Sequence, residues 1–145
     1  MMVGVSMLLN IPITTQNSFV WGVFGFIAVA LAPSVGMPPE LPGMPAADLY
    51  TRQIWWVVTI LATSTALYMW LFAKNYWWQL SAFIIAIAPQ LFAPINAAKS
   101  ESNLPASLAA EFASSSLAAN LVMWLAISYF VALALQKYQK DIAAL

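Results

Sequence analysis

Long uncharged stretches, separated by a few charged side chains, dominate the pattern of this sequence. Residues 53–73, 75–98 and 112–136 contain no Asp, Glu, Lys or Arg. Each stretch is as long as the roughly 20 residues that a membrane-spanning helix needs at ~1.5 Å per residue. Residues 1–39 are also uncharged and have room for one span after an apolar lead-in. The pattern therefore predicts an all-α integral membrane protein with four transmembrane helices.

Aromatic side chains support the boundaries of these helices, because Trp and Tyr concentrate where a membrane meets water. Trp55 and Trp56 open the second uncharged stretch, Tyr76 opens the third, and Tyr138 follows the fourth. We predict the spans near Ser18–Met37, Gln53–Ala73, Tyr76–Ile95 and Ala109–Gln136.

The predicted spans pair into two tandem hairpins, residues 18–73 and 76–136, within a single membrane domain that covers residues 1–145. Residues 1–17 form an N-terminal apolar segment, whose hydrophobic part, Met1–Ile13, is too short to cross a bilayer. We expect it to be a half-inserted or interfacial segment, or the remnant of a longer helix. It lacks the basic residues that begin a signal peptide.

The distribution of charge predicts the orientation. Lys74 and the tail at residues 137–145 lie on one side of the predicted membrane, with three basic residues and one acidic residue. The connections on the other side carry two basic and three acidic residues: Arg52, Lys99, Glu40, Asp48 and Glu101. By the positive-inside rule we expect both termini to be cytoplasmic, in a bacterial-type inner membrane.

The composition of the chain excludes several classes of function. The chain is 63% hydrophobic and 7% charged, with a mean hydropathy of +0.81, whereas soluble domains are about 45–50% apolar and about 25% charged. This excludes a water-soluble monomer. Net charge is zero, so no basic surface is available for nucleic acid. With no His and no Cys, the usual haem, iron–sulfur and zinc ligands are missing, and we predict that the chain is not an enzyme.

A short motif occurs twice. Residues 30–33 read Ala-Leu-Ala-Pro and residues 86–89 read Ala-Ile-Ala-Pro, and each is followed five residues later by Pro38 or Pro94. This is either coincidence in an Ala- and Pro-rich membrane protein or a parallel repeat with a pseudo-twofold axis along the membrane normal. The prolines of the motif free helix carbonyls, which either build an ion site or simply end a helix.

Few polar side chains are candidates for chemistry. Asp48 and Arg52 are spaced for an ion pair on one helix turn, and the alternative makes Asp48 a cation ligand. Glu111 shares a helix face with several serines, which suits either a hard cation or a neighbouring helix. The candidate metal ligands are Glu40, Asp48, Gln90 and Glu111. In the first helix, a stripe of small residues predicts close packing: Gly22, Gly25, Ala28 and Ala32.

Residues 38–48, Pro-Pro-Glu-Leu-Pro-Gly-Met-Pro-Ala-Ala-Asp, and the following Arg-Gln-Ile-Trp-Trp at residues 52–56 resemble the CbtA family. The resemblance extends over about residues 19–135 and includes Leu104 through Asn120. It implies a helical membrane fold and a cobalt transporter subunit. Members of that family typically carry His at the position of Gln90.

Two functions follow from these observations. The first is a non-catalytic small integral-membrane subunit of a larger complex, structurally CbtA-like, whose partners are the lipid bilayer and other membrane subunits. The alternative is a divalent-cation permease subunit of the cobalt type, in which the four candidate ligands line a path. The sequence leaves any cofactor unknown. A divalent cation is one candidate, and the chain supplies no haem or iron–sulfur ligands of its own.

Overall fold

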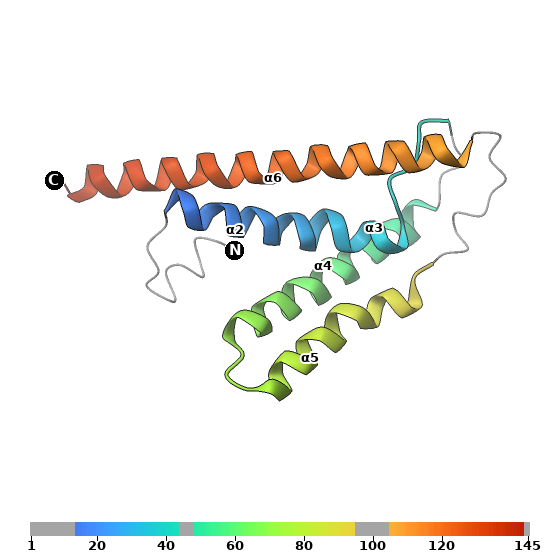
Figure 1. Ribbon diagram of the computed structural model, residues 1–145, viewed down its shortest axis with the longest axis horizontal. Helices are drawn as coiled ribbons and strands as arrows, with labels where there is room; N and C mark the ends of the chain where they lie inside the picture. Colours follow the sequence, from blue (N-terminus) through green and yellow to red (C-terminus); the bar gives the residue numbers. More distant parts are fainter. Residues whose placement is uncertain (1–13, 44–47, 95–104, 144–145) are drawn as a thin grey trace. The chain divides into compact units, whose positions relative to one another are not determined.

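The computed structural model describes residues 14–43, 48–94 and 105–143, and all regular structure in these ranges is helical (Figure 1). The prediction of an all-α chain is confirmed. Three helical segments are long and apolar enough to cross a membrane: Thr15–Gly36, Leu49–Phe72 and Ala106–Asp141. They match the first, second and fourth predicted spans. Of the predicted N-terminal segment, residues 1–13 lie outside the described residues, and residues 15–17 belong to the first helical segment.

The third predicted span is shorter than expected. Helix α5, Tyr76–Ile87, has 12 residues and continues into a five-residue 3-10 helix, η2, Ala88–Phe92. Pro89 explains the change, because it has no N–H to donate to the carbonyl four residues before it and its ring collides with that carbonyl. Four spans are therefore not established, and the segment is not among the three that are long enough.

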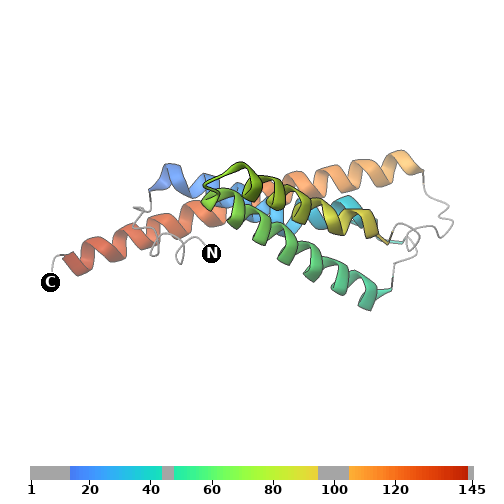
Figure 2. The same cartoon turned by 90° about the horizontal axis from the view of Figure 1, so that it is seen from below.

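Two packed units make up the chain: Met1–Phe26 with Ala119–Leu145, and Ile27–Ala118. In the first unit, helix α2, Thr15–Phe26, runs beside the C-terminal part of helix α6, Ala106–Ala143 (Figures 1 and 2). The small-residue stripe makes this approach possible. A Cβ on Gly22 would lie 2.5 Å from Ser128 Oγ, and one on Gly25 would lie 2.5 Å from Trp124 Cε3.

The second unit is built around helix α4, Leu49–Phe72, which packs antiparallel to α5 (Figure 2). Asn75 starts α5 as its N-cap, with Oδ1 accepting a hydrogen bond from Trp78 N at 3.1 Å. The π-helix η1, Ile27–Leu31, and the short helix α3, Ala32–Gly36, pack against α4.

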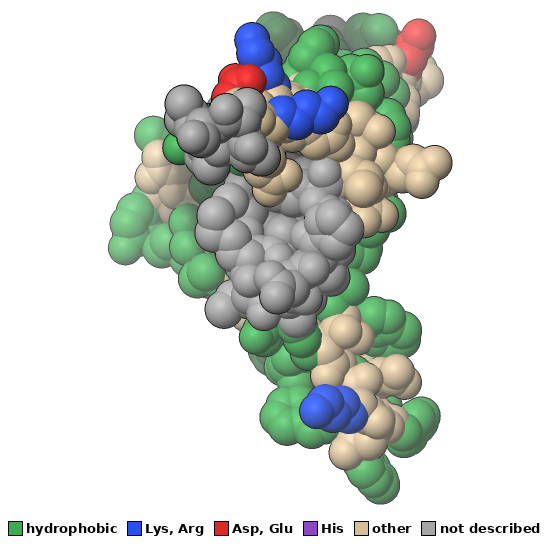
Figure 3. All heavy atoms as spheres, turned by 90° about the vertical axis from the view of Figure 1, so that its left-hand side faces the viewer, with side chains coloured by type: hydrophobic (Ala, Val, Ile, Leu, Met, Phe, Trp, Pro, Cys, Tyr) green, Lys and Arg blue, Asp and Glu red, His purple; other side chains and the backbone are tan. Residues whose placement is uncertain are grey.

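Most of the apolar helix surface faces outward. Only 22% of the residues in the apolar windows of the first two long segments are buried, and only 11% in the third. Figure 3 shows hydrophobic side chains over much of the described surface on one face, with few charged ones among them. Such a surface is stable in contact with lipid or with other apolar helices, because water would hydrate it poorly.

Candidate functional site

The π-helix η1 joins helix α3 beside Pro33, and we call this junction the Pro33 kink. Pro33 has no N–H to offer the carbonyl of Val29, and the preceding residues form the π-helix η1. Two tryptophans of α4 supply donors instead. Trp56 Nε1 donates to Val29 O at 3.1 Å, and Trp55 Nε1 donates to Pro33 O at 2.9 Å. Val29 O, which Pro33 deprives of the N–H four residues on, thus has a donor from another helix. Pro33 O, which also accepts from Met37 N at 3.1 Å, has a second one.

Gln90 provides a third donor to the same segment. Its Nε2 donates to Ala32 O at 3.0 Å from the 3-10 helix η2. Its Oε1 is buried and accepts no hydrogen bond from the described residues. This bond joins the first copy of the repeated motif to the residue that directly follows the second copy. One copy forms the π-to-α junction, and the other ends α5 as a 3-10 helix.

Close packing fixes Trp55 in this position. Trp55 is 7% exposed, and a Cβ placed on Gly36 would collide with its ring and approach Ala93 Cβ to 2.9 Å. In the sequence, Trp55 and Trp56 were interpreted as markers of the membrane interface. Their role as hydrogen-bond donors to Pro33 O and Val29 O was missed. The signal was Pro33 itself, since a proline within a membrane helix leaves a carbonyl that must find a donor elsewhere.

The predicted Asp48–Arg52 ion pair is wrong, because Arg52 pairs with Glu40 instead. Glu40 lies in the connection that follows α3, and both side chains are partly buried, with 21% of Glu40 and 35% of Arg52 exposed. The pair joins this connection to the first turn of α4. Glu40 thereby neutralises the Arg52 guanidinium, for which the spacing in the sequence predicted Asp48 as the partner.

Asp48 is occupied as the N-cap of α4. Its carboxylate accepts hydrogen bonds from Thr51 N at 2.9 Å and from Thr51 Oγ1 at 3.1 Å. The backbone N–H of Thr51, followed by its hydroxyl, holds the pKa of Asp48 below its ordinary value. An ionised cap is favourable here, because the first turn of a helix has N–H groups without intrahelical partners.

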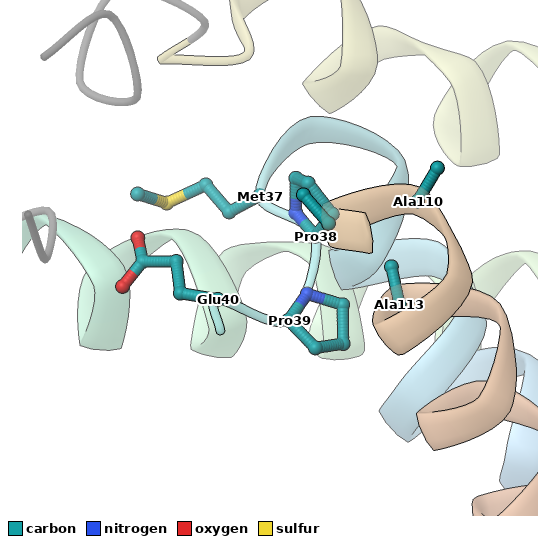
Figure 4. A pocket seen from close by; sticks show the side chains of 7 residues that line it. Met37, Pro38, Pro39, Glu40, Ala110 and Ala113 are labelled. Carbon is teal, nitrogen blue, oxygen red and sulfur yellow. The ribbon is translucent and has the colours of Figure 1, made fainter. Parts of the chain in front are cut away.

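A cavity of about 210 Å³ lies beside Glu40. Its lining is almost entirely apolar: Met37, Pro38, Pro39, Glu40, Ala109, Ala110 and Ala113. Figure 4 shows Pro38 and Pro39 beside Ala110 and Ala113 of α6, while the Glu40 carboxylate points away from these alanines. The cavity thus offers apolar contact and no set of polar ligands.

Glu111 is exposed on α6, as are Ser107, Ser114 and Ser115. Ser114 Oγ donates to Glu111 O of the same helix at 2.9 Å. Among the residues that the structure describes, no three Asp or Glu side chains lie close enough to hold a metal ion together. The four candidate ligands have separate surroundings: an ion pair for Glu40, a helix cap for Asp48, a backbone carbonyl for Gln90 and the helix surface for Glu111.

A comparison with protein families matches nearly the whole chain. The family model described as "Probable cobalt transporter subunit (CbtA)" matches residues 1–136. The chain belongs to the CbtA family. The comparisons with curated proteins and with solved structures give no match. The matched residues include Pro33, Glu40, Arg52 and Gln90.

Proposed function

We propose that this chain is a non-catalytic integral-membrane subunit of a larger transport complex for cobalt or a similar divalent cation. The observation that carries the proposal is the low burial of the three long helical segments, in whose apolar windows only 11–22% of the residues are buried. Helices in lipid associate through close packing and interhelical hydrogen bonds, so a chain with so little internal packing has most of its surface available to partners. Membership of the CbtA family supplies the transport context.

The polar groups of the chain support a structural role. Glu40, Asp48 and Gln90 each bind a group of the chain itself, which is how residues that fix a fold behave. A path for a borderline divalent metal is usually built from nitrogen or sulfur ligands, and the sequence contains neither His nor Cys. We therefore propose that partner subunits carry the metal ligands and that this chain packs beside them.

Native mass spectrometry of the full chain, extracted from its own membranes in mild detergent, tests this proposal. We expect the tagged chain to carry unrelated polypeptides at fixed stoichiometry. A matched control is the same tag on an unrelated membrane protein of similar size. Recovery of the chain alone, or only with copies of itself, would overturn the accessory-subunit proposal.

The alternative is a divalent-cation permease subunit in which Glu40, Asp48, Gln90 and Glu111 contribute oxygen ligands. One observation favours it: Gln90 Oε1 is buried with no donor among the described residues, next to the backbone carbonyls at the kink. Amide and carbonyl oxygens suit hard divalent cations.

The double variant Asp48→Asn with Glu111→Gln separates the two functions, because both changes keep side-chain size and Asn still caps a helix. Cobalt uptake would be measured in cells that depend on this chain and normalised to its amount in the membrane. A permease should lose about tenfold or more in uptake, the usual range for disturbed metal sites. An accessory subunit should stay within about twofold of the parent. Asp141→Asn, outside the candidate set, is the control.

We also propose four membrane crossings with both termini cytoplasmic, in a bacterial-type inner membrane. Lys74, Lys137 and Lys140 would then share the cytoplasmic side. Helix α5 with η2 would make the short crossing, at about 28 Å from the usual rises of α- and 3-10 helices.

The chain has no cysteine, so single-cysteine variants report topology without background. A membrane-impermeant maleimide applied from outside should label Ser107→Cys and leave Lys74→Cys unlabelled. Equal labelling at both positions, or the reverse pattern, would contradict the proposed topology.

A further inference from the structure

Three side chains bind the carbonyls of one short segment. Trp56 binds Val29 O, Gln90 binds Ala32 O and Trp55 binds Pro33 O. The donors come from α4 and η2, and the acceptors lie at the junction between the π-helix η1 and α3. The conformation of this segment is therefore set by hydrogen bonds from other elements, in addition to those within its own helix.

The three hydrogen bonds differ in how readily they can open. Trp55 is 7% exposed and its ring packs directly against Gly36. Trp56 is 46% exposed, so its indole N–H has access to other acceptors, such as a lipid headgroup or water. Gln90 is incompletely satisfied, because its Oε1 is buried without a donor among the described residues. An unsatisfied buried acceptor weakens the net gain from keeping the amide in place.

A regular α-helix is the natural alternative to the π-helix in this segment. Hydrogen bonds in a π-helix join residues five apart instead of four, and π-helices occur mostly as single-turn bulges, often at functional sites. Opening the bonds to Val29 and Ala32 would remove two of the restraints that hold Ile27–Leu31 in the π-helical conformation. Pro33 keeps the break in the hydrogen-bond ladder in both conformations, because it lacks an N–H.

We propose that Ile27–Gly36 is a two-state conformational switch, with Trp55 as its fixed anchor and with Trp56 and Gln90 as a releasable latch. In the latched state the carbonyls of Val29 and Ala32 are bound to α4 and η2. In the released state they are free, while Trp55 still holds Pro33 O. The inference goes beyond the proposed function, since it concerns how the fold changes state and requires no metal or partner.

The change of state is confined to the residues before Pro33. Trp55 holds Pro33 O in both states, and the residues that follow Gly36 lead directly to Glu40, whose carboxylate pairs with Arg52 on the first turn of α4. The Glu40–Arg52 pair therefore stays closed on release.

Hydrogen exchange of the full chain in detergent micelles, read by mass spectrometry, tests the switch. The variants Trp56→Phe and Gln90→Met each remove one latch donor and keep side-chain bulk. We expect each to accelerate amide exchange in residues 27–37 by about fivefold, which corresponds to ~1 kcal/mol for one hydrogen bond. Exchange in residues 119–136 of α6 should not change.

Matched controls lie on α4 and on α5, the helix that continues into η2. Trp70→Phe changes an exposed tryptophan of α4, and Gln79→Met changes a glutamine of α5, and neither side chain donates to the kink. Both controls should leave exchange in residues 27–37 within about twofold of the parent. Unchanged exchange in the latch variants, or equal acceleration in residues 119–136, would overturn the proposal, since the second outcome is general destabilisation.

Trp55→Phe separates the anchor from the latch. Because Trp55 is buried and holds Pro33 O, its loss should accelerate exchange throughout residues 27–94 and lower the melting temperature. The latch variants should lower the melting temperature less than Trp55→Phe does and should confine the faster exchange to residues 27–37. If Trp55→Phe produced only the local effect of Trp56→Phe, the anchor assignment would be wrong.

Discussion

The two units hold their helices together by different means. In the first, α2 approaches α6 because Gly22 and Gly25 leave room for Ser128 and Trp124, and Phe19 and Tyr129 stack with ring centroids 6.0 Å apart. In the second, side chains of α4 and η2 bind backbone carbonyls around Pro33. The first unit relies on shape, and the second relies on directed hydrogen bonds in addition to shape.

The difference shows that a proline in a membrane helix leaves a backbone carbonyl without its usual N–H donor, and that side chains of neighbouring elements supply the missing hydrogen bond. A regular helix satisfies its own backbone, so close packing needs only small residues, as along α2. A helix broken by Pro33 needs donors at defined positions, and each donor must come from a particular neighbour. The second unit is therefore more sensitive to single polar substitutions, and this sensitivity can be measured.

The largest effect is expected from Gly36→Ala. The added methyl would collide with the ring of Trp55, which cannot move without breaking its bond to Pro33 O. We expect a loss of about 3 kcal/mol, at the upper end for overpacking, and a smaller loss for Gly22→Ala. Denaturant unfolding in detergent measures both.

The control for Gly36→Ala is Val35→Ala, on the same short helix at a side chain that is 67% exposed. It should change stability little. If Gly22→Ala proved the more damaging of the two glycine variants, shape would dominate in both units and the contrast between them would fail.

Trp55→Phe should have the next largest effect. It keeps an aromatic ring in the buried site but removes the donor to Pro33 O, so a buried acceptor loses one of its partners. We expect a loss of about 1–2 kcal/mol in unfolding free energy. Trp70→Phe, on the same helix and 55% exposed, should lose far less. Equal losses would mean that ring size rather than the hydrogen bond matters at this position.

The Glu40–Arg52 ion pair of the second unit should contribute less to the free energy of unfolding than the hydrogen bond from Trp55 does. A double-mutant cycle of Glu40→Gln and Arg52→Gln is expected to give a coupling of about 0.5–1 kcal/mol, since both side chains are partly exposed. A cycle of Asp48→Asn with Arg52→Gln should give almost none. Should the larger coupling belong to Asp48, the arrangement described for the start of α4 would be incorrect.

Most of the fold could be predicted from the sequence, because charged residues are rare and mark the ends of apolar helices. The first predicted span, Ser18–Met37, lies within three residues of the observed Thr15–Gly36. The third prediction was too long because the apolar stretch continues past Pro89, where the α-helix changes to a 3-10 helix. Hydropathy detects the apolar stretch but cannot detect that Pro89 lacks a backbone N–H.

The candidate site was harder to predict. Asp48 was a recognisable cap, since it precedes a helix and is followed three residues later by Thr51, but its spacing to Arg52 suggested an ion pair. The donors to the kink are more than twenty residues away from their acceptors. Their pairing depends on how α4 and η2 pack, and local patterns in the sequence contain no record of that packing.

The smallest expected effect is the pH dependence of the Asp48 cap. Hydrogen bonds from Thr51 lower its pKa, so the unfolded chain binds the proton more readily than the folded chain does. The contribution of the cap is complete above the ordinary Asp pKa of about 3.9 and is lost as pH falls through the lowered value. Thermal unfolding between about pH 6 and pH 3 should therefore show a steeper acid loss in the parent than in Asp48→Asn, whose cap does not titrate. Parallel curves for the two proteins would show that the charge of the cap contributes nothing to stability, and that α4 begins at Leu49 for reasons of packing with η1 and α5.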